Sequence, residues 1–196
     1  MKKYTRTLFP ALALAAATLA VNPAGGWSNT SELPRTTGLQ VTRDQASTAE
    51  WLQEKVRHEL VMLPYYGVFD HITCRVDGDR VELNGQVHRP LLKSAAARVV
   101  EQIEGVSSVT NNIEVLPLSP NDDRIRLSVY RAIYGSNALY RYNLQPVPSI
   151  HIIVKNGRVT LEGVAANEMD RNIASIKARS VPGVFSIAQN IAVEKK

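Results

Sequence analysis

Cysteine is almost missing from this chain of 196 residues, because Cys74 is the only one. A single cysteine excludes a disulfide within the chain. A redox site would require a second cysteine or an electropositive setting, whereas the neighbours of Cys74 alternate between apolar and polar as in a strand. We therefore expect a buried, unreactive thiol. A lipoprotein would carry a cysteine just after its signal sequence, and none stands there, so we expect no lipid anchor.

Long apolar runs are also missing. The main apolar stretch, residues 8–21, is too short to span the hydrocarbon core of a bilayer. Three cations precede it, which is typical of a secretory signal peptide. We expect a signal peptide over 1–26 with cleavage near 20–26, a flexible linker over 27–45, and a periplasmic mature chain with no transmembrane span. An uncleaved membrane anchor is the alternative.

Motifs of catalysis and metal binding are missing too. The four histidines show no zinc-binding spacing. Cys74 lies three positions after His71 on the expected strand, so the two side chains should point to opposite faces of the sheet. Neither a nucleophile elbow nor a phosphate-binding glycine loop occurs. We therefore expect no enzymatic activity, no metal and no cofactor.

An internal repeat is the clearest feature that is present. At an offset of 78 residues (163 − 85), the segments 72–115 and 150–193 align without a gap. Thirteen of the 44 aligned pairs are identical, where unrelated sequences would share roughly three. The upstream helices align at an offset of 73, so copy two carries five extra residues (78 − 73) before its first strand. The chain is therefore a duplication.

Each copy has the pattern of a helix, two strands, a helix and a last strand. The first helices begin at the capping sequences 47–50 and 119–122. A hairpin follows, with a glycine in its turn, and then a second helix near 90–103 or 167–180. The last strands should cover 106–115 and 184–193. We assign structural turn or cap roles to six glycines: Gly78, Gly85, Gly105, Gly157, Gly163 and Gly183.

The strands have one apolar and one polar face, which fixes the expected architecture. The fold class is α+β, with two tandem αββαβ domains over 46–117 and 118–194. Each domain should be a three-stranded mixed sheet with both helices on one face. The sheet should be mixed because the second helix crosses over between the second and third strands and makes these two strands parallel.

The repeated segments also carry a family resemblance. They are 81–87 (VELNGQV) with 105–113 (GVSSVTNNI), and 156–163 (NGRVTLEG) with 181–184 (VPGV). On these segments the chain resembles tandem BON-domain proteins, a family named for an osmotically induced periplasmic protein and nodulation proteins. The resemblance implies a non-enzymatic binding role in the cell envelope, with phospholipid as ligand, in envelope integrity or osmotic stress. A protein-interaction or chaperone-like role on envelope proteins is the alternative.

The surfaces of the two copies differ in charge. Residues 46–117 hold 7 basic and 10 acidic residues, or −3, whereas 118–196 hold 11 basic and 6 acidic, or +5. Tyrosine and arginine in copy two suit an anionic membrane interface. Inter-domain packing of the tyrosines is the alternative, and export argues against nucleic acid as a partner. The candidate lipid or partner surface is Arg124, Arg126, Tyr130, Arg131, Tyr134, Tyr140, Arg141 and Tyr142.

Copy one has an aromatic group of its own, Tyr65, Tyr66 and Phe69, between its first helix and first strand. We expect it either to pack between the domains or to form a second contact surface.

Overall fold

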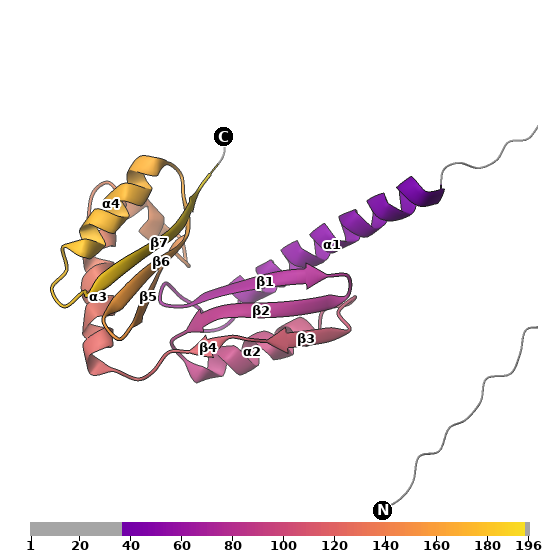
Figure 1. Ribbon diagram of the computed structural model, residues 1–196, viewed down its shortest axis with the longest axis horizontal. Helices are drawn as coiled ribbons and strands as arrows, with labels where there is room; N and C mark the ends of the chain where they lie inside the picture. Colours follow the sequence, from indigo (N-terminus) through magenta and orange to yellow (C-terminus); the bar gives the residue numbers. More distant parts are fainter. Residues whose placement is uncertain (1–36, 195–196) are drawn as a thin grey trace, which may run out of the picture. The chain divides into compact units, whose positions relative to one another are not determined.

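The computed structural model describes residues 37–194, with side chains from residue 48 onward. The expected signal peptide lies outside the described residues. Two α-β-β-α-β copies follow one another (Figure 1), which confirms the predicted fold class. Copy one consists of α1 (Thr37–Val61), β1 (His71–Asp77), β2 (Arg80–Val87), α2 (Pro90–Glu101), β3 (Ser108–Asn111) and β4 (Glu114–Val115). Copy two consists of α3 (Pro120–Tyr134), the 3-10 helix η1 (Tyr140–Leu144), β5 (Ile150–Lys155), β6 (Arg158–Ala165), α4 (Glu168–Arg179) and β7 (Ser186–Val193).

Helix α1 is longer than the sequence pattern predicts. It begins at Thr37, so residues 37–45 are helical where we expected part of a flexible linker, and the expected cap at Ser47 lies inside the helix. The physical reason is that no proline or glycine occurs between residues 39 and 60. Without a proline or glycine to interrupt it, the helix extends upstream of Ser47, because a single capping residue is too weak a signal to fix the helix start.

Each sheet has the predicted mixed topology. In copy one, β2 pairs antiparallel with β1 and parallel with β3 and β4. In copy two, β6 pairs antiparallel with β5 and parallel with β7. The last strand of copy one is therefore divided into two pieces, whereas the last strand of copy two is continuous.

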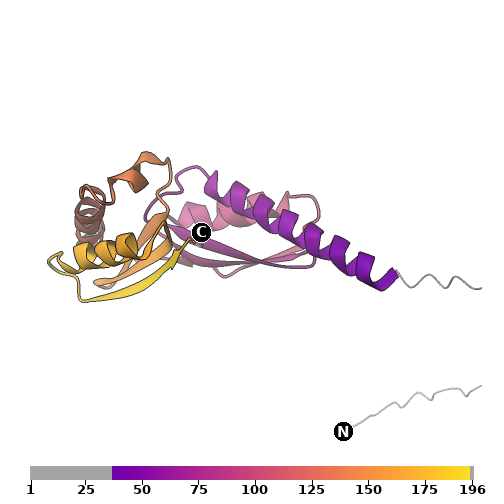
Figure 2. The same cartoon turned by 90° about the horizontal axis from the view of Figure 1, so that it is seen from above.

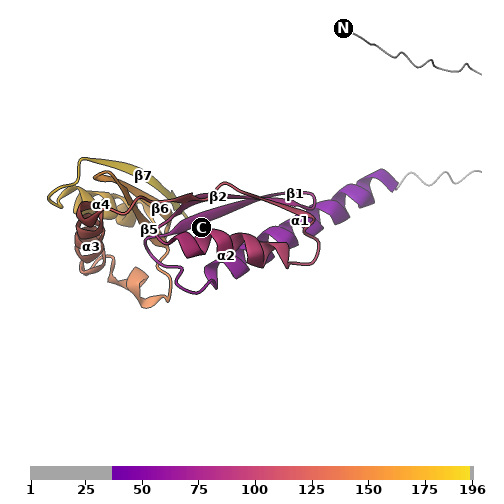
Figure 3. The ribbon, with the colours of Figure 1, turned by 90° about the horizontal axis from the view of Figure 1, so that it is seen from below.

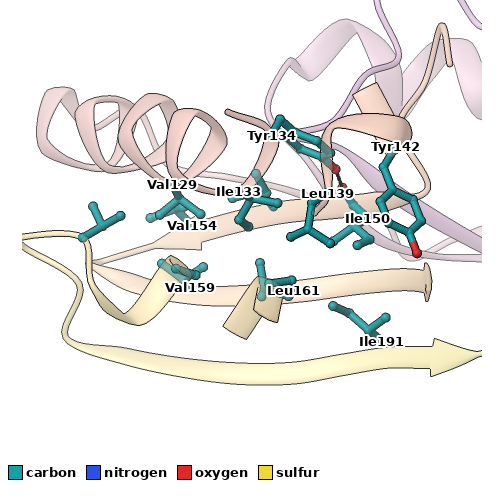
Figure 4. Packing of buried hydrophobic residues seen from close by; sticks show 14 of the residues in the cluster. Val129, Ile133, Tyr134, Leu139, Tyr142, Ile150, Val154, Val159, Leu161 and Ile191 are labelled. Carbon is teal, nitrogen blue, oxygen red and sulfur yellow. Dashed lines mark hydrogen bonds between the residues drawn. The ribbon is translucent and has the colours of Figure 1, made fainter. Parts of the chain in front are cut away.

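In each copy the two helices cover the same face of the sheet, as Figures 2 and 3 show from two sides. Copy one buries Leu52, Val56 and Leu60 of α1 against β2 and α2. In copy two, Figure 4 shows Val129 and Ile133 of α3 directed toward the strand residues Val159 and Leu161. These aliphatic positions follow the predicted 3.6-residue and two-residue periods. Among the described residues, no helix has the length and apolar character needed to cross a bilayer.

Two of the predicted structural glycines lie where the backbone of a neighbouring strand segment approaches closely. Gly85 and Gly163 have φ values of 121° and 112°. A Cβ atom at Gly85 would lie 2.0 Å from the carbonyl oxygen of His71, and one at Gly163 would lie 2.0 Å from that of Ser149. Both positions therefore exclude any side chain. The other four predicted glycines also have positive φ.

Candidate lipid-binding or partner-binding surface

Helix α3 carries most of the candidate surface, and its first turn is held by side chains. Ser119 is the N-cap, and its hydroxyl accepts a hydrogen bond from the Asp122 amide at 3.2 Å. Pro120 occupies the first helical position, where a backbone N–H would have no partner within the helix, so its absence from proline costs nothing. The start of α3 therefore agrees with the predicted capping sequence.

The carboxylate of Asp122 fixes this helix to the β5–β6 turn. It is buried and accepts hydrogen bonds from the amides of Asn156 and Gly157, each at 2.8 Å. Both turn residues have positive φ, 54° and 73°, as a two-residue hairpin turn of type I′ requires. Sequence reasoning missed this role because Asp122 looks like an ordinary acidic residue in a helix's first turn.

Three of the eight predicted surface residues lie in the core of copy two, and for them the surface prediction is wrong. Arg126 is 2% exposed, donates to the carbonyl of Val154 at 2.7 Å and pairs with Asp123. Tyr134 is also buried, and its hydroxyl donates to the carbonyl of Ile150 (Figure 4). Burial raises the pKa of Tyr134 above its ordinary value.

Tyr142 is the third buried residue, and it forms a network with Arg141 and Asp170. Its hydroxyl donates to the buried Asp170 carboxylate at 2.5 Å and accepts from the Ala166 amide at 2.9 Å. Arg141 is exposed but pairs with Asp170, and its guanidinium lies 5.1 Å from the centre of the Tyr142 ring. The charge of Arg141 is therefore already compensated, and its main contact is structural.

Tyr130 is half-buried and belongs to an aromatic cluster. Its ring centre lies 5.0 Å from that of Tyr134 and 6.1 Å from that of Phe69, and its hydroxyl donates to Asn143 at 2.7 Å. Phe69 belongs to copy one, so this aromatic pair supports the inter-domain packing alternative. A groove of about 480 Å³ runs beside it, bordered by Leu127, Tyr130 and Phe69 among others.

The remaining predicted residues, Arg124, Arg131 and Tyr140, are exposed. Arg124 and Arg131 lie seven residues apart on α3, with the exposed side chain of Leu127 between them. This spacing places all three on one side of the helix, and we call Arg124, Leu127 and Arg131 the α3 outer stripe. Among the described residues, Arg124 bonds only the neutral amide of Asn121, and the Arg131 guanidinium has no partner.

The cations of copy two divide into two groups. Arg126, Arg141, Lys155 and Arg171 each pair with a carboxylate. Among the described residues, five others have no acidic partner: Arg124, Arg131, Arg158, Lys177 and Arg179. The excess positive charge of copy two is therefore presented to solvent rather than neutralised internally.

Two of the histidines, His71 and His151, form a pair apart from this stripe. The rings of His71 and His151 are 5.3 Å apart, and the Tyr66 ring is 5.8 Å from that of His151. Burial, helped by the neighbouring His71, lowers the pKa of His151 to about 4. Burial also lowers the pKa of His71 and raises the pKa of Tyr66 to about 12. No group of three or more metal-ligating side chains occurs among the described residues.

Cys74 is half-buried rather than fully buried. Its sulfur lies 4.0 Å from the carbonyl oxygen of Gln53 in α1. Burial raises the pKa of the thiol, which lowers the fraction of reactive thiolate at neutral pH. The unreactive character expected from the sequence agrees with this shift.

Comparison with protein families gives two consecutive matches to the BON domain, at residues 48–117 and 121–195. The chain belongs to the BON-domain family. BON domains are non-catalytic binding domains. They are associated with phospholipid binding and with cell-envelope proteins linked to osmotic stress. The α3 outer stripe lies in the second BON domain.

No curated protein matches this tandem BON chain. The solved structures similar to it include two of CdsD, a structural protein of the type III secretion system of Chlamydia trachomatis. A structure of its C-terminal domain is 12% identical, covering 70% of this chain and 96% of that one, with a TM-score of 0.26. The other is also 12% identical, covering 74% and 92%, with the same TM-score of 0.26.

Proposed function

We propose that this protein is a non-enzymatic binding protein of the periplasm that associates with anionic phospholipid surfaces through its second BON domain. The α3 outer stripe is the contact. The family's association with phospholipid binding and osmotic-stress envelope proteins supports this choice of ligand, and a role in envelope integrity under osmotic stress would follow from it.

One observation carries the proposal, the difference between the outer stripe of α3 and its counterpart on α1. At the offset of 73, Arg124, Leu127 and Arg131 correspond to Trp51, Glu54 and His58. Copy one therefore has an acidic residue at the centre of the stripe and no permanently charged cation. Of these two described stripes, that of copy two alone combines two guanidinium groups without an acidic partner and an exposed aliphatic side chain.

This combination suits the surface of an anionic bilayer. A cation close to such a surface contributes about 1 kcal/mol, and the attraction falls off within a Debye length. Leu127 lies between the two guanidinium groups, so it can enter the headgroup layer while they contact phosphate. Binding should therefore be peripheral, reversible and sensitive to salt.

Co-sedimentation of the full chain with vesicles tests the proposal. We expect binding to vesicles of phosphatidylcholine with phosphatidylglycerol and little binding to phosphatidylcholine alone. The double variant Arg124→Glu with Arg131→Glu should lower binding by about tenfold or more. Arg75→Glu with Arg98→Glu, at exposed positions of copy one, changes the net charge equally and should leave most of the binding. Equal binding to both kinds of vesicle, or equal losses in the two variants, would contradict the proposal.

A further inference from the structure

We propose that the free edge of β7 binds an extended peptide segment of another protein, which adds a fourth strand to the sheet of copy two. This interaction surface goes beyond the proposed lipid contact and does not depend on it, because no residue of the α3 outer stripe belongs to β7.

The topology leaves one side of β7 without a strand neighbour. β7 is the last strand in the order β5-β6-β7 and pairs in parallel with β6 from Ser186 to Val193. Its residues are largely exposed, and Ile191 is the only one that is buried. Within the part of the chain that the structure describes, no strand pairs with the other side of β7. The backbone groups there have unused hydrogen-bonding capacity.

Alternation along the strand identifies the backbone groups that face outward. The Glu194 amide donates to the carbonyl of Ala165 at 3.0 Å, in register with the parallel pairing of β6 and β7, so residue 194 directs its backbone groups toward β6. Successive residues of a strand with parallel pairing direct these groups to opposite sides. The N–H and C=O of Ile187 and Gln189 therefore point away from β6, toward the position of an added strand.

β7 also has none of the features that usually protect an edge. Its sequence, SIAQNIAV, contains no charged residue, no proline and no glycine over eight residues. Charged side chains, proline, bulges and very short strands are the usual means of preventing strand addition. A long, uncharged edge strand is therefore open to pairing.

Each of the other three edges is protected in some way. The edge of β5 is covered, because the Ile152 amide donates to the Val68 carbonyl at 2.7 Å. β1 carries two exposed charged side chains, Arg75 and Asp77. The last strand of copy one is divided into β3 and β4, which leaves only short pieces. Protection of three edges and not of the fourth distinguishes β7 as a binding surface.

The surroundings of β7 define the chemistry of the partner. Positive charge borders the strand, because Arg158 lies opposite Ser186 and has no acidic partner among the described residues. The Arg158 guanidinium lies 5.9 Å from the centre of the Phe185 ring, which is 79% exposed at the beginning of the edge. An extended segment with an acidic residue at the end near Arg158 fits this arrangement. A second copy fits less well, because pairing would bring together two domains of net charge +5.

A displayed library of random eight-residue peptides tests the inference, with the full chain as bait and the Gln189→Pro variant for counter-selection. Gln189→Ala removes the same side chain, including its bond to the Arg171 carbonyl, but keeps the N–H and is the control for this variant. Proline removes one outward N–H without removing a bond to β6, and edge strands tolerate it there. Circular dichroism of each variant verifies that the chain remains folded. Ala188→Lys is the second edge variant, and Thr73→Lys on the exposed edge of β1 is its matched control.

We expect selected peptides to alternate β-branched and polar residues, to carry an acidic residue at one end, and to bind wild type at least about tenfold more tightly than either Gln189→Pro or Ala188→Lys. Thr73→Lys and the double variant of the α3 outer stripe should bind these peptides like wild type, which separates this test from the lipid proposal. The inference is overturned if no peptide is enriched, or if enriched peptides bind Gln189→Pro and Ala188→Lys unchanged. Dimerisation that Gln189→Pro abolishes would equally overturn it, in favour of a second copy as the occupant.

Discussion

Single polar side chains hold copy two together at positions where copy one has none. Asp122 accepts two backbone hydrogen bonds from the β5–β6 turn, 34 and 35 residues further along the chain. The residue that corresponds to Asp122 in copy one, at the offset of 73, is Ala49. The duplication therefore preserves the apolar stripe of the first helix but not this polar connection.

Replacing Asp122 with alanine should lower the free energy of unfolding by about 2–3 kcal/mol. The amides of Asn156 and Gly157 would lose their acceptor in a buried place, and unsatisfied buried donors cost about 1–3 kcal/mol each. Urea denaturation measures the change. Glu104→Ala, at an exposed position, is the control and should stay within about 0.5 kcal/mol of wild type. Equal, small effects of both substitutions would show that the Asp122 bonds add nothing to stability.

The two glycines inside the strands should not tolerate alanine. At both Gly85 and Gly163 a methyl group would overlap a backbone carbonyl oxygen at 2.0 Å, so the strand itself would have to move. We expect Gly85→Ala and Gly163→Ala each to destabilise the chain by at least about 2 kcal/mol in thermal or urea unfolding. At Gly67 a Cβ atom would have no neighbour within 4 Å, so Gly67→Ala should change little. A near-neutral Gly163→Ala would refute the close approach.

The residue scale is also where prediction from sequence was least complete. Ile125, Val129 and Ile133 form a core stripe whose helical period is visible in the sequence. Arg126 and Tyr134 adjoin that stripe, but their burial depends on the carbonyls of Val154 and Ile150, which only the tertiary structure supplies. Composition alone grouped them with the exposed Arg124 and Arg131.

At the scale of elements, the last strands show how one substitution changes a repeated structure. Asn111 and Gln189 are equivalent at the offset of 78, and each donates to a carbonyl of the preceding helix, Lys93 at 2.7 Å and Arg171 at 3.2 Å. The shorter Asn111 side chain also accepts from the Ile113 amide at 3.1 Å. Such a local bond competes with strand pairing, and the strand is interrupted there. Sequence similarity predicted both strands but not this division.

The variant Gln189→Asn should therefore introduce the interruption of copy one into β7. We expect the asparagine side chain to accept from the Ile191 amide, so that pairing with β6 is lost over the next residues. Amide exchange of residues 190–192 should become faster, while that of 186–188 changes little. Unchanged exchange throughout β7 would show that the side chain at this position does not determine the continuity of the strand.

At the scale of the whole molecule, the two copies share cores and turns but differ in charge, and one histidine of each copy lies in a contact between them. His151 is buried and His71 is half-buried. His71 of copy one and His151 of copy two are in ring contact, and the His151 Nδ1 atom lies 3.3 Å from the carbonyl oxygen of Gly67. Tyr66 and Phe69, the aromatic group predicted either to pack between domains or to form a second surface, contact copy two. Tyr65 is exposed, with the Arg89 guanidinium 5.1 Å from its ring centre.

These histidines make stability depend on pH. The pKa of His151 is about 4 in the folded chain and that of a free histidine is 6.5, so the unfolded state binds more protons between these values. Stability should therefore fall as the pH decreases from about 6.5 to about 4, on the order of 2 kcal/mol for this residue. The pKa of His71 is also lowered, which acts in the same direction. Burial raises the pKa of Asp70, which acts in the opposite direction as the pH falls.

Urea unfolding at pH 7 and pH 4.5 measures this dependence. The variant His151→Gln should lose much of the difference between the two pH values, while the contributions of Asp70 and His71 remain in both proteins. If wild type and variant show the same difference, the buried histidine does not couple protonation to folding.

Copy two, and not copy one, is the part of the molecule that we propose to meet an anionic bilayer. An environment-sensitive dye at one cysteine tests this proposal most directly, because Cys74→Ser provides a cysteine-free background. The dye is attached through Leu127→Cys on α3 or Leu91→Cys on α2, both at exposed leucines. With phosphatidylglycerol vesicles we predict a blue shift at position 127 and none at 91. A shift at 91 alone, or binding with no shift at 127, would contradict the account.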